Sequence, residues 1–370
     1  MLLNGRPSRT IWPAAGADAV TVLDQRALPH RVESLVLRSV DDAVHAIADM
    51  AVRGAPLIGV TAAYGLALQA RADAGDAALQ RAAGQLEASR PTAVNLAWAV
   101  RRMLAELMRC PVGERAPRAW RLAAQLADDD VAVNERLGEH GVALLRALAS
   151  RAPNRPLNVL THCNAGWLAT VDWGTALAPV YRAQAEGLAV HVWVDETRPR
   201  NQGASLTAFE LREQGVPHTV IADNAGGHLM QRGQVDAVIV GCDRVTASGD
   251  VANKIGTYLK ALAARDCGVP FWVAMPLSTL DRSLHDGLAE IPIEQRRERE
   301  VTHLAGRASD GSTVEVQLVP DGTPALNPAF DVTPARLVSA LITERGVVPA
   351  TREGLSSLFD VRQREPIDGR

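Results

Sequence analysis

The chain has 370 residues, of which 47% are hydrophobic and 22% charged, and its formal net charge is −3. This composition is ordinary for a globular protein, and it offers no excess of positive charge for nucleic acid or an anionic membrane. A chain of this length exceeds what one compact core usually holds, so we expect two domains.

The cysteines indicate neither a disulfide framework nor a zinc site. The four in the chain are Cys110, Cys163, Cys242 and Cys267. No two of them form a CxxC pair, and no His/Cys spacing suits zinc. No secretory signal pattern and no apolar run of about 20 residues is visible. We therefore expect a reduced, cytoplasmic protein without a metal and without a membrane or nucleic-acid partner.

The first 150 residues have the pattern of helices. Apolar residues recur at helical spacing in four stretches, at 39–52, 59–75, 92–108 and 118–149. An earlier stretch, "LPHRVESLVLR" at 28–38, is more strand-like. Residues 1–150 are predicted to form a mainly helical N-terminal domain.

The pattern changes after the turn-rich stretch "SRAPNRP" at 150–156, which is the predicted domain boundary. Short apolar runs then alternate with helical segments, at 157–163, 188–196, 217–224, 235–243 and 270–276. This alternation indicates a parallel sheet covered by helices on both faces. Residues 151–370 are therefore predicted to form a Rossmann-like, doubly wound domain, and the protein belongs to the α/β class. The stretch 327–348 suggests a loop, an N-capped helix and a final extended piece.

Cys163 lies in a polar cluster, "THCNAG", that follows the first of these apolar runs. Most cysteines in such a position are buried and inert. Here His162 and Asn164 flank the thiol, and Gly166 suggests a turn from strand to helix. Ligands bind beyond the carboxyl ends of the strands in doubly wound folds, and a helix N-terminus would favour a thiolate. Cys163 is therefore a candidate functional residue.

Asp243 follows the strongly apolar run "VDAVIVG". It is either a helix N-cap or a general acid at the end of a strand. An apolar setting raises the pKa of a carboxyl, which would keep it protonated near neutral pH. Cys242 should point to the opposite face and serve packing.

Four further stretches suggest contacts with an anionic sugar. In "GDVANKIGTY", Asn253 and Lys254 offer a donor and a charge near a helix start, although the P-loop spacing is absent. Arg53 in "VRGAPLIG" and Arg90 in "SRPTAVNL" each precede a helix start, where Thr92 is a possible cap. Gln202 lies in a polar loop at 195–211 and could read sugar hydroxyls. Each of these stretches could equally be a solvated loop or a plain helix connection.

Taken together, the motifs resemble one family. In order and spacing, the chain is similar to S-methyl-5-thioribose-1-phosphate isomerases in "VRGAPLIG", "SRPTAVNL", "THCNAGWLAT", "DETRPRNQGASLTA", "GCDRVTASGDVANKIGTY", "PFWVAMPLSTLD", "IPIEQR" and "NPAFDVTPARLVSALITERGVV". The match spans nearly the whole chain. The wider superfamily includes ribose-1,5-bisphosphate isomerases and the regulatory subunits of translation initiation factor 2B.

The resemblance implies a fold, an activity and site residues. The fold is a helical N-terminal domain with a Rossmann-like C-terminal domain, usually as a homodimer. The activity is an aldose–ketose isomerisation in methionine salvage that needs no cofactor and acts on a small sugar phosphate. Asp243 matches the catalytic acid, and Cys163 matches the cysteine that abstracts a proton or stabilises the transition state. The matches to substrate-binding positions are Arg53, Gly54, Ala55, Arg90, Gln202, Asn253 and Lys254.

Departures from the family pattern leave other functions open. Trp167, Asn201, Ser205, Phe209 and Cys242 replace the usual residues. The substrate could instead be 5-deoxyribose 1-phosphate or ribose 1,5-bisphosphate, although no second cationic cluster is evident for a 5-phosphate. The protein could also be a regulatory sugar-phosphate-binding protein, which would need no catalytic pair. The presence of both Cys163 and Asp243 argues against this alternative. A nucleotide-dependent dehydrogenase ranks last because no GxGxxG follows the first strand of the sheet.

Overall fold

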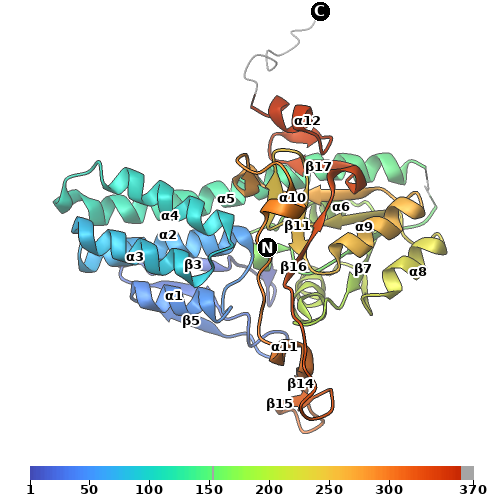
Figure 1. Cartoon of the computed structure of the whole chain (residues 1–370), viewed down its shortest axis with the longest axis horizontal. Coiled ribbons are helices and arrows are strands. Elements are labelled where there is room, and N and C mark those ends of the chain that lie inside the picture. The colour runs from blue at the N-terminus through green and yellow to red at the C-terminus, as the bar shows by residue number, and fades with distance from the viewer. Residues whose placement is uncertain (152–153, 360–370) are drawn as a thin grey trace, which may run out of the picture.

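The computed structural model describes residues 1–151 and 154–359, so the predicted boundary at 150–156 lies partly outside the described residues. A group of helices lies beside a parallel sheet, and the chain runs from the first to the second (Figure 1). The predicted α/β class, with a helical N-terminal region and a parallel sheet in the C-terminal region, is confirmed. No helix in the described part of the chain combines the length and apolar character needed to cross a membrane.

Short strands precede the helices. The strands are β1 (Leu2–Leu3), β2 (Arg6–Pro7), β3 (Ile11–Pro13), β4 (Val20–Leu23) and β5 (Ser34–Leu37). β3, β4 and β5 form an antiparallel sheet. The extended stretch predicted at 28–38 is thus a strand only in its second half.

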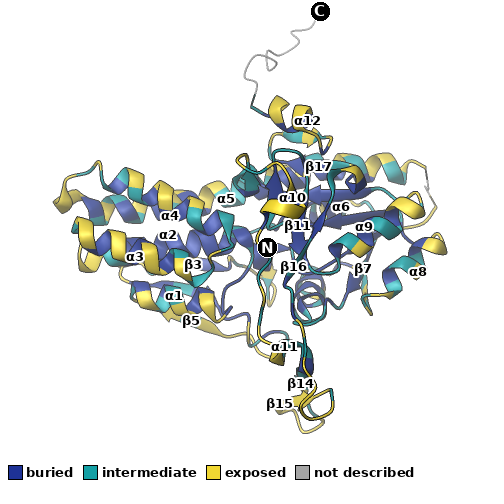
Figure 2. Cartoon of the chain, in the orientation of Figure 1, coloured by how far each residue is buried: buried dark blue, intermediate teal, exposed yellow. Residues whose placement is uncertain are grey.

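The N-terminal helices enclose one core. They are α1 (Val40–Ala48), α2 (Ala55–Ala72), α3 (Asp76–Ser89), α4 (Val94–Leu107) and α5 (Val112–Ala149). Ser39 and Asp42 cap α1 reciprocally, each side chain accepting from the other's backbone N–H. α2 is buried around most of its circumference, because the other helices surround it (Figure 2).

α5 connects the two regions. Its Leu122 and Leu126 pack in the core of the helical region, whereas Leu137 and Leu145 pack against the parallel sheet. The two regions therefore share a structural element, which fixes the N-terminal helices beside the sheet.

The central sheet has the strand order β18-β17-β12-β9-β6-β7-β8. Its members are β6 (Leu157–Thr161), β7 (Val190–Asp195), β8 (His218–Ile221), β9 (Ala237–Val240), β12 (Phe271–Ala274), β17 (Ala340–Thr343) and β18 (Gly346–Val348). All pairs are parallel except β17 with the edge strand β18. The order of the parallel strands is that of a doubly wound dinucleotide-binding fold.

Helices cover both faces of this sheet. Val159 of β6 packs with α5, α6 (Ala178–Ala185) and α7 (Ala208–Glu213). Its neighbour Leu160 points to the other face and packs with α8 (Ala225–Gln231) and α9 (Thr257–Asp266). Because both faces are buried, the strands are continuous apolar runs, as predicted.

The remaining elements lie around the junction of the two regions. A smaller sheet has the order β13-β10-β11-β16. Its strands are β10 (Arg244–Thr246), β11 (Val251–Lys254), β13 (Leu280–Asp281) and β16 (Phe330–Thr333). The hairpin β14 (His303–Arg307) with β15 (Thr313–Gln317) protrudes from the body (Figure 1), and the short helices are α10 (Gly287–Glu290), α11 (Arg299–Thr302) and α12 (Arg352–Ser357).

The predicted helix within 327–348 is wrong. This stretch forms β16, one 3-10 turn at Ala335–Leu337, and the strands β17 and β18. Leu341 and Ile342 alternate between the two faces of the central sheet. Tertiary burial on both faces therefore selects a strand here over the local helical spacing.

Candidate active site

Cys163 and Asp243 lie beyond the carboxyl ends of β6 and β9. These two strands are neighbours in the sheet. From β6 the chain adds β7 and β8 on one side, and it then crosses to add β9, β12 and β17 on the other. In open α/β sheets, ligands bind in the crevice outside the point where the strand order reverses. The topology thus brings both residues to the position where a ligand is expected.

Cys163 adopts a left-handed backbone conformation, with φ at 65°. Its N–H donates to Thr197 Oγ1 at 2.8 Å, and its carbonyl accepts from Thr207 Oγ1 at 2.8 Å. The thiol donates to Gln202 Oε1 at 3.3 Å. A residue other than glycine rarely takes this conformation, and such residues concentrate at functional sites. Two threonines from distant segments therefore hold the cysteine in a costly geometry.

The predicted α-helix directly after Cys163 is wrong. The chain makes only a 3-10 turn at Trp167–Ala169, and the next α-helix, α6, begins at Ala178. Trp167 is fully buried in the core, which draws this segment into a compact loop. The charge beside the thiol comes instead from Arg53 and Lys254, both of which interact electrostatically with Cys163.

Arg53 reaches the loop after Cys163 from the start of α2. Its guanidinium donates to both Asn164 Oδ1 and, at 2.7 Å, the Asn164 backbone carbonyl. Gly54 has a φ of 96°, and a Cβ there would lie 2.4 Å from the Ala169 carbonyl. Only glycine fits this close approach, which brings Arg53 and the N-terminus of α2 against the loop. The predicted helix start after Arg53 is confirmed.

Asp243 lies among cationic side chains. Burial raises the pKa of its carboxyl, while the charges of Lys254, Arg90 and Arg53 oppose that rise. Its backbone N–H donates to the Ala252 carbonyl at 2.9 Å, and the next residue begins β10. Asp243 is therefore not a helix cap, and its carboxyl is available to the cleft.

Asn253 and Lys254 end strand β11, and α9 begins three residues later at Thr257, so the predicted helix start near them is confirmed. Lys254 Nζ donates to the Ala329 carbonyl at 2.9 Å and lies 4.4 Å from the centre of the Phe330 ring. Burial lowers the pKa of Lys254, and its electrostatic interactions with Cys163 and Asp243 act in the opposite direction. Asn253 donates to Thr257 Oγ1 at 3.1 Å.

Arg90 is the C-cap residue that follows α3, and it lines the same pocket as Asp243. Its Nη2 lies 3.3 Å from Glu294 Oε2, and its buried Nε has no hydrogen-bond partner within the described residues. The predicted cap at Thr92 is wrong, because α4 has Ala93 at its N-cap and no side-chain cap. Thr92 instead accepts a hydrogen bond from Arg244 through its carbonyl.

Six of the nine predicted site residues line two hollows, and Cys163, Asn253 and Lys254 line neither of them. Apolar side chains complete a small pocket around four of these residues, which are Gly54, Ala55, Arg90 and Asp243. The apolar lining includes Ile58, Ala93, Ile291, Ile293 and Phe330. Arg53 and Gln202 line a larger, open groove that extends toward the hairpin β14–β15. Cys163 is 7% exposed and contacts this groove through Gln202.

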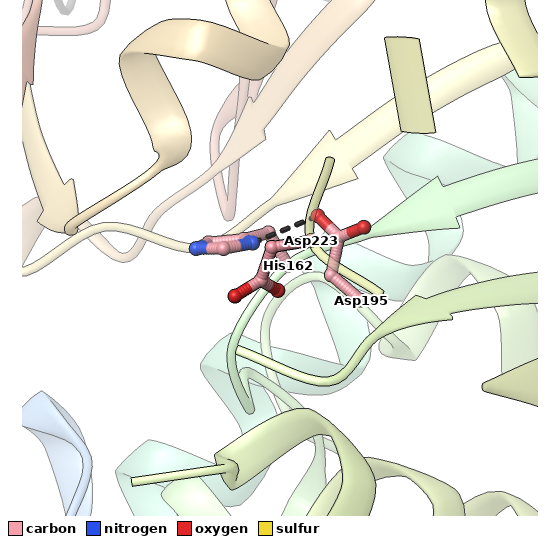
Figure 3. A group of neighbouring side chains, drawn as sticks. All are labelled: His162, Asp195 and Asp223. Atoms are coloured by element: carbon pink, nitrogen blue, oxygen red, sulfur yellow. Dashed lines mark hydrogen bonds and ion pairs between the residues drawn. The ribbon is translucent and has the colours of Figure 1, made fainter. Parts of the chain in front are cut away.

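A second polar cluster lies next to Cys163 but is internally compensated (Figure 3). His162, Asp195 and Asp223 place potential metal-ligand atoms within 4.8 Å of one another. Both nitrogens of His162 are engaged, by Asp195 Oδ2 and by the Ile255 carbonyl, each at 2.8 Å. Lys260 supplies a cation at 3.2 Å from the same Asp195 oxygen. The donor set therefore fits a buried ion-pair network better than a metal.

Sequence reasoning did not identify Glu210 and gave Asn164 no specific role. Glu210 is fully buried and accepts hydrogen bonds from the Asn164 side chain and, at 3.3 Å, from the Leu168 N–H. A single acidic residue within the helical stretch "LTAFEL" carries no local signal of burial. The structure shows why Gly166 lies beside it: a Cβ at Gly166 would overlap the Glu210 carboxyl. This contact joins segments that are distant in the sequence.

Comparison with known proteins identifies the family. The family model described as the initiation factor 2 subunit family matches residues 51–350. The chain belongs to this family. Within it, methylthioribose-1-phosphate isomerases are the close relatives. That of Methylorubrum populi is 63% identical over 98% of this chain and all of the relative, and that of Paramagnetospirillum magneticum is 60% identical with the same coverage.

Solved structures of the family share the fold. The 5-methylthioribose 1-phosphate isomerase from Pyrococcus horikoshii is 40% identical with a TM-score of 0.81, and the match covers 96% of this chain and 97% of that one. The translation initiation factor eIF-2B subunit delta from A. fulgidus is 39% identical with a TM-score of 0.77, covering 95% and 99%. Proteins named for different functions thus share one fold, so the function of this chain has to be argued from the residues of its site.

Proposed function

We propose that this protein is an aldose–ketose isomerase of methionine salvage that converts S-methyl-5-thio-α-D-ribose 1-phosphate into S-methyl-5-thio-D-ribulose 1-phosphate. The observation that carries the proposal is the position of Cys163 and Asp243 on either side of the switch point of the sheet, with cations around both. Relatives with this name and about 60% identity support it.

The positive charge in the cleft suits a sugar phosphate. Among the residues that the structure describes, Arg53 hydrogen-bonds only to the neutral Asn164, and Lys254 contacts a carbonyl and an aromatic ring. Arg90 shares Glu294 with Arg296. Buried cations with so little compensation favour a ligand that brings negative charge. We assign phosphate binding to Arg53, Arg90 and Lys254, with Gly54 and Ala55 at the start of α2 and with Asn253. Gln202 would bind sugar hydroxyls.

Asp243 would open the sugar ring. The phosphate on carbon 1 prevents the ring from opening as a free aldose does, so the ring oxygen needs an acid. Burial raises the pKa of the Asp243 carboxyl, which favours the protonated form that a general acid requires. That proton passes to the ring oxygen as its bond to carbon 1 breaks, which leaves a hydroxyl on carbon 4, an oxocarbenium ion at carbon 1 and an ionised Asp243.

Cys163 would then move the hydrogen from carbon 2 to carbon 1. As a thiolate it takes the proton from carbon 2, which gives an enol phosphate, and it returns the proton to carbon 1. The hydroxyl on carbon 2 becomes the ketone and gives its proton to Asp243, so both residues regain their starting states. In the alternative, a hydride moves directly from carbon 2 to carbon 1 and Cys163 only polarises the reacting centre.

The pocket beside Asp243 favours an apolar substituent on carbon 5. Isoleucines 58, 291 and 293 and Phe330 line it. Such a pocket discriminates weakly between a methylthio group and a smaller apolar group, so 5-deoxyribose 1-phosphate is the second candidate substrate. Isomerase relatives at 63% identity, against 39% for the initiation-factor subunit, make a purely regulatory role the weaker alternative.

Proton NMR in heavy water would test the proposal with methylthioribose 1-phosphate, 5-deoxyribose 1-phosphate and ribose 1,5-bisphosphate. Formation of the ribulose 1-phosphate from the first sugar is the expected result, and the relative rates identify the preferred substrate. Deuterium at carbon 1 would support the enol route, whereas its absence would favour a hydride shift or a shielded thiol. No turnover of any of the three would refute the isomerase proposal. We also expect the protein to be cytoplasmic. We expect it to be a homodimer, and sedimentation can check this oligomeric state.

A further inference from the structure

A buried carboxylate behind the cleft is joined to the site by a chain of hydrogen bonds. Glu210 on α7 accepts from the Asn164 side-chain amide through Oε1 and from the Leu168 N–H through Oε2. Asn164, the residue after Cys163, accepts from the guanidinium of Arg53. The three side chains therefore run as one chain from the interior at Glu210 to the groove at Arg53.

The chemistry of the groups fixes the direction of this chain. A guanidinium can only donate, so the Asn164 oxygen must face Arg53 and the amide NH₂ must face inward. That NH₂ donates to Glu210 and, at 3.1 Å, to Thr207 Oγ1. Because Leu168 N–H also donates to Glu210, both carboxyl oxygens have to accept. An ionised carboxylate is the group that meets this demand.

We propose that Glu210 is a positioning residue for the isomerase reaction: through Asn164 it orients Arg53 toward the substrate phosphate and holds the loop that carries Cys163. This inference rests on the proposed function for its substrate. Glu210 does not face the cleft and takes no part in the chemistry. Its effect reaches the substrate through Arg53.

The surroundings of Glu210 make this support sensitive to pH. Burial raises the pKa of its carboxyl to about 7, against the N–H donors of Leu168 and Asn164, the charge of Arg53 and the Tyr181 hydroxyl on α6. Asp172 lies beyond Tyr181 and acts on that phenol. Protonation of Glu210 removes an acceptor from Asn164 and a negative charge from the neighbourhood of Arg53. Substrate binding should therefore weaken as the pH falls below about 7.

The first test is Glu210→Gln, which keeps the shape and removes the charge. One oxygen of the new amide can accept, but its NH₂ then faces a donor, so the Asn164–Arg53 chain loses its support. We expect KM for methylthioribose 1-phosphate to rise on the order of tenfold or more, with a smaller change in kcat. The part of the KM–pH profile that titrates near 7 should disappear in this variant, whereas titration of the substrate phosphate remains in both proteins.

Asp130→Asn is the matched control. Burial also raises the pKa of Asp130 to about 7, but this carboxylate on α5 accepts from the Val171 N–H at 2.7 Å and does not contact Asn164 or Arg53. Its replacement removes a carboxyl that titrates in the same range. The KM–pH profile of Asp130→Asn should match that of the wild type, which separates the role of Glu210 from a general effect of buried acids.

A double variant, Asn164→Asp with Glu210→Gln, reverses the chain without breaking it. The introduced carboxylate would accept from Arg53, and the introduced amide would donate to that carboxylate and accept from Leu168 N–H. If Glu210 acts by orientation, the KM of each single variant should be raised, and the KM of the double variant should return at least part of the way to the wild-type value. A role in mere folding would not predict recovery from two changes inside the same buried cluster.

Alkylation of Cys163 keeps the test independent of turnover. Iodoacetamide labelling, followed by peptide mass spectrometry, reports access to this thiol, and inorganic phosphate should protect it in the wild type. Protection should fall in Glu210→Gln and persist in Asp130→Asn. If the wild type does not turn over methylthioribose 1-phosphate, the proposed function is refuted, but the positioning role of Glu210 is not. A Glu210→Gln variant that is folded, and within twofold of the wild type in both KM and phosphate protection, would overturn the positioning role.

Discussion

Two buried lysines lie near the site, and they are held in opposite ways. Lys260 on α9 is 4% exposed, contacts the Asp195 carboxylate at 3.2 Å and donates to the Asp223 carbonyl. Lys254 on β11 is 9% exposed, and within residues 1–151 and 154–359 its side-chain nitrogen contacts only the Ala329 carbonyl and the Phe330 ring. The first charge is compensated by the protein, and the second is compensated only in part.

The same contrast separates the neighbours His162 and Cys163. Each ring nitrogen of His162 faces an oxygen that can only accept, so the ring is held as a fixed part of the Asp195 network. Cys163 points its thiol toward Gln202, a lining residue of the groove. The network of Lys260 and His162 thus joins the ends of strands, whereas Lys254 and Cys163 are the residues that we propose act on a ligand. Compensation distinguishes structural charges from functional ones at almost the same depth.

The largest effect should come from the reacting groups on the uncompensated side. Asp243→Asn and Cys163→Ala should each lower kcat by on the order of a hundredfold or more, because each removes a positioned acid or base. Neither residue holds the Asp195 network, so both variants should stay folded. Steady-state kinetics together with thermal unfolding would measure the two effects.

Asp195→Asn is the control from the compensated side. It leaves His162 and Lys260 without their shared carboxylate, so it should lower the unfolding temperature more than either site variant does. Near wild-type turnover in Asp243→Asn or Cys163→Ala would remove that residue from the mechanism.

The lysines themselves give the next largest effect. Lys260→Met should destabilise the fold by about 3 kcal/mol, because it leaves a buried Asp195 without its cation. Lys254→Met should be neutral or stabilising, since an incompletely paired charge becomes apolar. It should nevertheless raise KM more than it lowers kcat, as expected for a phosphate contact. Chemical denaturation and kinetics on both variants would make the comparison.

Inorganic phosphate sharpens this prediction. A ligand that binds only the folded state raises its stability. Phosphate should therefore raise the unfolding temperature of the wild type, and it should do so less in Lys254→Met. A loss of stability in Lys254→Met as large as that in Lys260→Met would contradict the distinction between the two lysines.

Much of the fold could be predicted from the sequence because burial on two faces gives a plain signal. The apolar runs that became β6, β7, β9 and β12 were all identified. The segment 340–343 was not, because local spacing there suits a helix and only its neighbours in the sheet make it a strand. The local sequence pattern does not predict which strands become neighbours in the sheet.

Candidate site residues could be named from the sequence, but the contacts between them could not. Cys163, Asp243 and Arg53 were named from their positions beside strands and helix starts, and the topology brings their segments together. The helix proposed after Cys163 does not form, so the charge near the thiol has another source. Glu210 was missed because its partners, Asn164 and Leu168, are more than forty residues away in the chain.

The smallest effect concerns the pH dependence of stability. The pKa of Asp243 is raised by burial from its ordinary value of 3.8. Above pH 3.8 the unfolded chain loses this proton while the folded chain retains it, so folding takes up a proton in that window. The free energy of unfolding should therefore fall as the pH rises from 3.8 to the raised pKa, and level off above it. Asp243→Asn has no such proton, so its stability relative to the wild type should increase over the same window. Urea unfolding of both proteins at pH 4 and pH 8 measures this difference. An advantage of the variant that shrinks toward pH 8 would mean that the surrounding cations already compensate Asp243, and Asp243 would then belong with the structural charges such as Asp195.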